Sequence, residues 1–491
     1  RFRARMSGAV TKAQRLQFMP GETILKEDPY AWSLETEYRN NTCQFCLQSV
    51  NVDKQRLCES CFDLVYCSDA CKEGDKLYHE LECKVRRSAN DKPRGNEERL
   101  VIRMIDRSLR EQREGCETVG NYFGHRRTIS DLMTHVEDLS GPALQKANEN
   151  AERIYQFVEA HIQISMREIL FMLQRFKINA HSIFRFPTPV DYTIIGAGVY
   201  LAASKMNHTC DRTPYTQIFD GRSLALRAIE RFQVTDPLSL VIHYVPPNMP
   251  FAQRQQALRN HYYFTCQCPK CLAEARKPSV EADKSTAEAI EMVLYSTGYD
   301  KKVWLTSAQK VLERATRHLP DENYLVYKLL HDLAKTCANV GKYDQGIDYG
   351  IRALKGTATY VCRLSILFLI CDCIAKSGPP QKKAKYVKKF HDYIQETKRL
   401  LVLIYGAETP RIDLLPSADL SGGRRIAFNS KSSSRVKIPM HRHDATGSSY
   451  RRGFSYARGR RRPQTAYPPL RRRRVSLKSF SRGRFRRRSF F

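Results

Sequence analysis

Apolar residues recur every three or four positions along several stretches of the chain, which is the spacing of one buried helix face. The longest stretch spans 323–354, where NYLVYKLLHDLAKTCANV is joined to YDQGIDYGIRAL by Gly-Lys. Similar patterns lie at 151–184 and in RLLVLIYGAETP at 399–410. These patterns predict a mainly helical region at 85–186 and another at 279–410.

Between the two helical regions, short segments alternate apolar and polar residues or are continuously apolar, and Gly, Asp or Pro bounds them. GRSLALRAI at 221–229 and PLSLVIHYVPP at 237–247 are of this kind. Such segments are typical of small β-strands. A chain of 491 residues is long enough for roughly two to four domains with buried cores, so we expect an α+β protein of several domains.

Neither a membrane protein nor a secreted protein is indicated. No run of 18 or more apolar residues occurs, and the N-terminal RFRARMSGAV lacks the apolar segment of a signal peptide. The chain begins at Arg1 rather than at a methionine, which indicates a fragment.

The net charge of +31 is concentrated at the C-terminal end. Residues 421–491 hold 22 of the 82 Lys and Arg residues but a single acidic residue, Asp444. This Arg-, Ser- and Gly-rich region has too few aliphatic residues for a core, so we predict disorder over 416–491. Three interpretations stay open: nucleic-acid binding through phosphate contacts, a nuclear-import signal, and a non-native reading frame.

Cysteine spacing gives the strongest chemical signal. Eight soft ligands form four close pairs: Cys43 with Cys46, Cys58 with Cys61, Cys67 with Cys71, and His79 with Cys83. Eight ligands suffice for two tetrahedral zinc sites, and because protein fills every position these sites are expected to be structural. Clustered thiols also favour a reducing compartment, nucleus or cytoplasm. Five further cysteines without such a pattern are expected to be buried thiols: Cys116, Cys337, Cys362, Cys371 and Cys373.

This array resembles the MYND zinc finger. The resemblance implies an interleaved pattern, with one zinc on Cys43, Cys46, Cys67 and Cys71 and the other on Cys58, Cys61, His79 and Cys83. Lys76 stands where the family usually has a tryptophan. That departure concerns partner binding and leaves the zinc ligands in place.

The motif KMNHTC, Lys205 to Cys210, lies after one apolar segment and before the two strand-like segments and the cluster YYFTCQCPKC. With the N-terminal PGETILKEDP and the inserted finger, this order resembles the SET and MYND-domain protein-lysine methyltransferases from about Pro20 to Pro410. The resemblance implies seven regions: the N-terminal part of the SET domain (1–42), the MYND finger (43–83), a helical insert (84–186), the SET core (187–250), a zinc-bound post-SET segment (251–278), a helical domain similar to tetratricopeptide repeats (279–415) and the basic tail (416–491).

The same resemblance implies roles for individual residues. Asn207 and His208 bind S-adenosylmethionine, and Tyr244 is the active-site tyrosine that orients the lysine amine. Tyr262 and Phe264 form the lysine channel, because aromatic faces suit a sulfonium and an ammonium. Further candidate cofactor contacts are Ser204, Asn179, His135 and Phe264. A third structural zinc is held by Cys210, Cys266, Cys268 and Cys271.

Lysine methylation by this scheme needs alignment of donor and acceptor and exclusion of water, and no metal takes part in the chemistry. The expected partners are a histone or non-histone protein with a target lysine, peptides bound by the finger and the helical domain, and nucleic acid bound by the tail. We expect a monomer without a membrane partner.

One departure keeps a second hypothesis open. The family's Gly-x-Gly motif is expected near Ala9 to Thr11, where the chain reads SGAVTK. Either the N-terminus is incomplete or mis-spliced, or catalysis has weakened. In the second case the protein is an adaptor that recruits peptide partners, for example in transcriptional repression. The C-terminal helices are then a scaffold rather than a lid over the substrate cleft.

Overall fold

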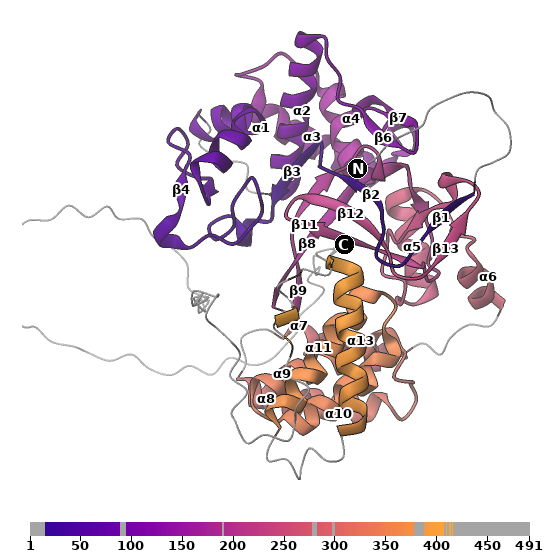
Figure 1. Ribbon diagram of the computed structural model, residues 1–491. Coiled ribbons are helices and arrows are strands. Elements are labelled where there is room, and N and C mark those ends of the chain that lie inside the picture. Colours follow the sequence, from indigo (N-terminus) through magenta and orange to yellow (C-terminus); the bar gives the residue numbers. More distant parts are fainter. Residues whose placement is uncertain are drawn as a thin grey trace, which may run out of the picture. The chain divides into compact units, whose positions relative to one another are not determined.

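The computed structural model describes residues 15–88, 95–188, 191–276, 282–296, 300–377 and 387–406, together with Thr409, Ile412, Asp413 and Leu415. Within these residues helices and strands are both abundant (Figure 1), which confirms the α+β class. No helix among them is long and apolar enough to cross a membrane. The predictions for SGAVTK and for the tail after residue 415 lie outside the described residues.

The strands form small sheets around an apolar core that includes Trp32 and Tyr200. The central antiparallel sheet and its neighbour contain three strands each: β2 (Thr23–Glu27), β12 (Ser223–Ala228) and β11 (Tyr215–Asp220) in one, and β3 (Ala31–Leu34), β9 (Asp191–Val199) and β8 (Ala180–Thr188) in the other. The strand predicted at 221–229 is thus confirmed as β12. Gly196 is required here, because a Cβ at this position would lie 2.3 Å from the backbone oxygen of Ser33 on β3.

Two-stranded pairs complete the strand inventory. Four pairs occur among the described residues: β1 (Leu16–Phe18) with β13 (Phe232–Val234), β10 (Asn207–His208) with β14 (Val241–Ile242), β4 (Arg56–Leu57) with β5 (Val65–Tyr66), and β6 (Gly120–Tyr122) with β7 (His125–Arg127). The β10–β14 pair is parallel and the other three are antiparallel. The parallel pair brings Asn207 and His208 beside the strand that leads to Tyr244.

The region between the finger and the strands is helical, as predicted from its periodicity. Helix α1 (Asp69–Ser88) begins inside the finger and its last turn enters this region, which also contains α2 (Asn96–Glu114), α3 (Gly141–Val158) and α4 (Met166–Asn179). The apolar faces of the four helices share one core. Helix α4 begins with a capping box between Ser165 and Glu168. It ends at Asn179 and strand β8 starts at the next residue, Ala180, before the boundary expected at residue 187. The sequence AHSIF at 180–184 pairs with β9, so sheet pairing ends the helix here.

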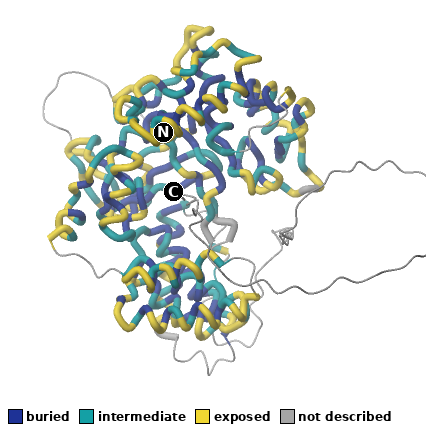
Figure 2. Tube along the Cα trace, turned by 180° about the vertical axis from the view of Figure 1, so that it is seen from behind, coloured by how far each residue is buried: buried dark blue, intermediate teal, exposed yellow. Residues whose placement is uncertain are grey.

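Helices dominate the C-terminal described region. They are α5 (Phe251–Tyr262), α6 (Pro269–Arg276), α7 (Lys284–Tyr295), α8 (Lys301–Ala315), α9 (Tyr324–Asn339), α10 (Tyr343–Ala353), α11 (Tyr360–Lys376) and α13 (Val387–Tyr405). The α9–α10 pair confirms the helices predicted at 323–354. Helix α13 covers 399–405 of the helix predicted at 399–410, but it ends at Tyr405. Gly341 has φ +77° in the turn between α9 and α10. Figure 2 shows buried segments inside the group α8 to α11 and exposed ones outside.

Short 3-10 helices fill several connections: Thr36–Tyr38, Val52–Lys54, η3 (Ile129–Asp131), η4 (Val136–Asp138), η5 (Ala203–Lys205), η6 (Pro237–Ser239) and Leu354–Gly356. Helices α11 and α13 also pack on the strands, where Leu367 and Leu400 share a cluster with Ile218 of β11 and Ala225 of β12.

Of the five cysteines outside the clusters, three are buried as expected, Cys362 is only half-buried and Cys116 is exposed. It follows the left-handed Gly115 that ends α2, so the prediction that Cys116 is a buried thiol is wrong.

Candidate functional site

The first four cysteines of the interleaved pattern lie together. Cys43, Cys46, Cys67 and Cys71 place their sulfur atoms within 4.8 Å of one another. The Sγ atoms of Cys46 and Cys67 are 3.6 Å apart, and those of Cys67 and Cys71 are 3.5 Å apart. Around a zinc ion with Zn–S bonds of 2.3 Å, tetrahedral ligands are separated by about 3.8 Å. The four thiols therefore fit a zinc ion.

The second group also fits, and its histidine is oriented by a buried ionic network. Cys58, Cys61, His79 and Cys83 lie within the same 4.8 Å limit, with His79 Nε2 3.3 Å from Cys61 Sγ. On the other side of the ring, Nδ1 lies 3.2 Å from a carboxylate oxygen of Glu82. Glu82 accepts hydrogen bonds from the Nε atoms of Arg99 and Arg103 on α2, at 2.6 and 2.7 Å. A carboxylate in this position fixes the imidazole of a metal ligand.

The charge state of Glu82 agrees with that role. Burial by itself raises the pKa of this carboxyl group, but the guanidinium groups of Arg99 and Arg103 outweigh it and lower the pKa well below its usual value. The finger is thereby joined to helix α2 by paired charges without exposed side chains.

The third group connects the Asn-His turn to the segment after the strands. Cys210, Cys266, Cys268 and Cys271 lie within 4.8 Å of one another. Helix α5 supports them from behind: the Gln255 side chain donates to Cys266 O at 2.9 Å and accepts from Cys266 N at 3.0 Å. The buried Arg254 places Nη2 3.7 Å from Cys271 Sγ. Four thiols and a nearby cation suit a thiolate zinc site.

The turn that carries KMNHTC is held from strand β2. Both carboxylate oxygens of Glu27 accept backbone hydrogen bonds, from Ala202 N at 2.8 Å and from Ala203 N at 2.9 Å. These two amides open the 3-10 helix η5, after which Asn207 and His208 form β10. Asn207 is exposed, so its amide is accessible to a ligand.

His208 contacts both the tyrosine strand and a cysteine of the third group. Burial lowers the pKa of His208 to about 4, so the ring is neutral at physiological pH. Its Nδ1 accepts a hydrogen bond from Tyr244 N at 2.9 Å. The remaining proton is then on Nε2, which lies 3.1 Å from Cys210 Sγ. The imidazole thus links Tyr244 to the third cysteine group.

Tyr244 lies in a cluster of aromatic rings. Its ring centroid is 4.7 Å from that of Tyr262, 6.4 Å from that of Phe264 and 5.2 Å from that of His208. The Tyr244 hydroxyl donates to Met206 O at 2.7 Å. Burial raises the pKa of Tyr244 to about 12, so this hydroxyl keeps its proton at neutral pH.

The other candidate cofactor contacts lie around the same turn. Asn179 Nδ2 donates to Met133 O at 2.9 Å, and Ser204 Oγ lies 3.4 Å from Asn179 O. His135 stacks on Tyr263 with centroids 4.8 Å apart, and Tyr263 stands between Tyr262 and Phe264 in the sequence. The structure therefore brings the sequence-predicted residues into one connected group.

Strained backbone occurs in this group. His135 and Tyr263, which stack on each other, have φ values of 50° and 60°. Left-handed backbone at residues other than glycine is uncommon and concentrates at functional sites. The left-handed backbone of both residues is locally unfavourable, so contacts with the surrounding structure must stabilise it.

Comparison with curated proteins points to one family. No family model matches the chain. Histone-lysine N-methyltransferase SMYD3 of Mus musculus is 22% identical over 347 residues, which cover 68% of this chain and 77% of the relative. N-lysine methyltransferase SMYD2 of Homo sapiens is 20% identical over 416 residues, covering 78% and 93%. Histone-lysine N-methyltransferase ASHR1 of Arabidopsis thaliana is 24% identical over 259 residues, covering 52% and 51%. These matches support membership of the SMYD family.

Sequence reasoning missed several residues that shape this site. Glu27 lies in the PGETILKEDP segment but was assigned no role, and Arg254 and Gln255 belong to no motif. Glu27 acts through backbone amides, and Arg254 and Gln255 act on cysteine ligands. Arg127 was missed as well: its Nε is buried without a hydrogen-bond partner, and its charge interacts with Tyr244 and Glu27. The sequence offered no signal for three of them, because Arg254 and Gln255 stand in the polar stretch AQRQQ and Arg127 ends the polar stretch HRR.

Proposed function

We propose that the protein is a protein-lysine N-methyltransferase that transfers a methyl group from S-adenosylmethionine to a lysine of a histone or non-histone protein. The observation that carries the proposal is the arrangement of Tyr244 with Tyr262 and Phe264 beside the Asn207–His208 turn. The names of the SMYD relatives, which are lysine methyltransferases, support the same reaction.

In the proposed reaction S-adenosylmethionine, when bound, supplies a methyl group activated by the sulfonium. The protein has to align a neutral lysine amine with that group and keep water away. The Tyr244 oxygen is fixed by its hydrogen bond to Met206 O. Its lone pairs are then available to accept a hydrogen bond from an N–H of the amine, which directs the nitrogen lone pair toward the methyl carbon.

The aromatic rings have a separate task. Tyr262 and Phe264 present faces and edges beside Tyr244, and such faces attract the positive charge that passes from sulfonium to ammonium during transfer. Burial raises the pKa of Tyr262 to about 12, so it stays neutral and does not act as an acid at physiological pH. These rings therefore stabilise the transition state by electrostatics and exclude water.

Cofactor recognition is proposed for the residues around the turn. The exposed amide of Asn207 is suited to the polar ends of S-adenosylmethionine, while both ring nitrogens of His208 are engaged by Tyr244 N and Cys210 Sγ. His208 is thus expected to contribute its ring face and backbone. The proposed cofactor site also includes Ser204, Asn179 and His135.

The three cysteine groups are proposed to hold three structural zinc ions. Each offers four ligands within 4.8 Å, which fills a tetrahedral zinc site and leaves no position for water. No step of methyl transfer passes through these ions. The third ion is expected to fix Cys210, and through His208 the backbone of Tyr244.

Methyl transfer from labelled S-adenosylmethionine to core histones and to a lysine-rich non-histone protein tests the proposal. Label that appears in the protein product only when this protein is present in the reaction supports the proposal. Calorimetry with S-adenosylmethionine adds a second measurement, in which a 1:1 event is expected. Failure of both transfer and cofactor binding would contradict the proposal.

An adaptor is the second candidate function, and exposed apolar residues on the finger favour it. Phe62 is 71% exposed and Leu57 is 38% exposed, and both adjoin the Cys58–Cys61 pair. Exposed large apolar residues are common at protein-interaction sites. Peptide binding without binding of S-adenosylmethionine would favour the adaptor over the enzyme. A location in the nucleus or the cytoplasm fits either function. Nucleic-acid binding by the basic tail is tested separately: binding should be salt-sensitive and should disappear when residues 421–491 are deleted.

A further inference from the structure

A cavity of about 660 Å³ lies between helices α2 and α4, apart from the Tyr244 cluster. Its walls combine apolar side chains, among them Ile105 and Leu109 from α2 and Phe171 and Met172 from α4, with charged ones. The charged residues are Glu111, Glu117, Arg167, Glu168 and Arg175. None of the candidate cofactor, channel or metal residues lines it. Its volume falls within the range of roughly 300–1,000 Å³ typical of small-molecule sites.

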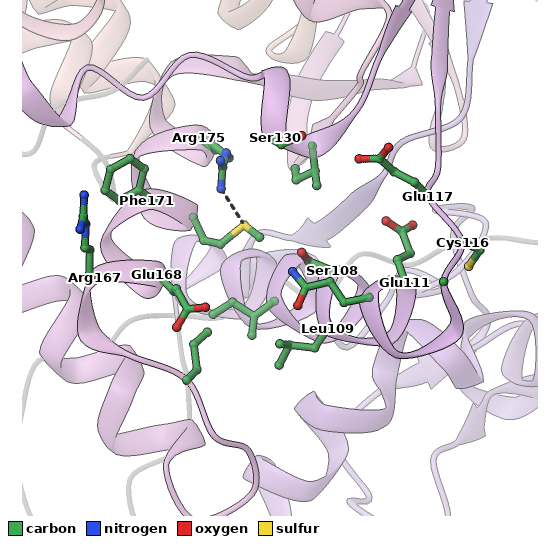
Figure 3. A pocket seen from close by; sticks show the side chains of 16 residues that line it. Ser108, Leu109, Glu111, Cys116, Glu117, Ser130, Arg167, Glu168, Phe171 and Arg175 are labelled. Carbon is green, nitrogen blue, oxygen red and sulfur yellow. Dashed lines mark hydrogen bonds between the residues drawn. The ribbon is translucent and has the colours of Figure 1, made fainter.

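Arg175 of α4 supplies a positive charge to this cavity (Figure 3). Its Nη1 contacts the thioether sulfur of Met172 at 4.0 Å, which is a weak interaction. Its Nε is buried without a hydrogen-bond partner. Among the residues that the structure describes, no carboxylate forms a salt bridge with Arg175, and burial lowers the pKa of this guanidinium. A buried donor without a partner is costly.

Two of the three carboxylates that line the cavity are already engaged. Glu111 accepts hydrogen bonds from Tyr30 and from Arg107, both at 3.0 Å. Glu168 caps its own helix through Ser165, with contacts at 2.7 and 2.8 Å. Figure 3 shows Glu117 and Cys116 at the end of the cavity remote from Arg167 and Arg175. The Arg175 guanidinium therefore lies beside apolar side chains and has no carboxylate as a salt-bridge partner among the described residues.

We propose that the cavity between α2 and α4 binds a small organic anion with an apolar body, whose acidic group pairs with Arg175. The apolar body contacts Phe171, Met172 and Leu109, while the guanidinium offers donors to a carboxylate. Arg167, whose guanidinium carbon is 5.6 Å from the centroid of the Phe171 ring, adds positive charge at the same end.

Calorimetry of the full chain with 2-naphthoate tests this site. Saturable 1:1 binding is expected, with affinity reduced by roughly tenfold or more in Arg175→Met because a charge-assisted hydrogen bond is lost. Arg87→Met removes an exposed arginine of α1 that does not line the cavity and should leave the affinity unchanged. The neutral 2-naphthamide should bind the unaltered protein at least tenfold more weakly than the acid, a comparison that needs no variant.

Equal affinity for the acid and the amide would overturn the proposal, as would equal affinity of the Arg175→Met protein. Absence of saturable heat at millimolar 2-naphthoate would overturn it too. Displacement of the probe by S-adenosylhomocysteine would place the probe at the methyl-transfer site instead. Because these outcomes do not depend on methyl transfer, they are distinct from failure of the proposed function.

Discussion

Single residues connect the metal groups to the candidate chemistry. His208 contacts Tyr244 N with one ring nitrogen and Cys210 Sγ with the other, although the sequence assigned cofactor binding to the imidazole and metal binding to the thiol. The close spacing of the Asn-His pair and Cys210 indicated that both tasks meet here. It could not show that one ring spans them, because that depends on the parallel pairing of β10 with β14.

Cys210→Ser should remove one zinc equivalent from a total of three. An alcohol is a poor zinc ligand, and a three-ligand site loses much of its metal-linked folding free energy. Metal analysis after purification under reducing conditions measures the count. His208→Ala is the matched variant and should keep three equivalents, because its ring lies outside the four-thiol group. A count of three in Cys210→Ser would show that other ligands build the site.

His181 should make stability depend on pH. Burial lowers its pKa to about 4 from an ordinary value of 6.5. Between these values the unfolded chain binds a proton that the folded chain excludes, so the free energy of unfolding falls as the pH decreases below 6.5 and levels off near 4. One pH unit in this range corresponds to about 1.4 kcal/mol. From pH 7.5 to 5.5 the unaltered protein should therefore lose about 1.3 kcal/mol more than His181→Gln, measured by denaturant unfolding. Equal losses would contradict the assignment.

At the scale of elements, periodicity predicted most helices, while the contacts between elements came from the structure. Helices α9, α10 and α13 follow regular apolar spacing. The change from α4 to β8 at Ala180 was less visible, because apolar residues continue through both elements and pairing with β9 decides the conformation. The cavity between α2 and α4 likewise depends on how two helices pack, which no local pattern encodes.

Glu27 illustrates such a contact between elements. Glu27→Ala would leave the buried amides of Ala202 and Ala203 without their acceptor, so the free energy of unfolding should decrease by about 1–3 kcal/mol. Because these amides open η5, S-adenosylmethionine binding should weaken as well. The neighbouring exposed Lys26 provides the control: Lys26→Ala should change stability by less than about 0.5 kcal/mol. Similar unfolding curves for the two variants would exclude Glu27 as the support of the turn.

At the scale of the whole molecule, the candidate zinc-binding regions could be predicted because most of their ligands lie close together in the sequence. The two finger groups and the Cys266–Cys271 cluster follow from spacing and resemblance, and the structure brings each set within 4.8 Å. Cys210 lies 56 positions before Cys266, so spacing alone did not join it to this cluster; the resemblance assigned it, and the structure brings the four thiols within 4.8 Å of one another. The role of the N-terminal SGAVTK and of the basic tail stays a prediction, because both lie outside the described residues.

Methyl transfer by Tyr244→Phe tests the central claim most directly. The change removes one hydroxyl and keeps the ring, so the aromatic contacts with Tyr262 and Phe264 persist. If Tyr244 aligns the amine, the rate of transfer should fall by roughly 100-fold or more while S-adenosylmethionine affinity stays almost unchanged. Tyr295→Phe, at a tyrosine that is 65% exposed on α7, is the matched control and should retain full activity. Equal transfer rates for Tyr244→Phe and the unaltered protein would contradict the account.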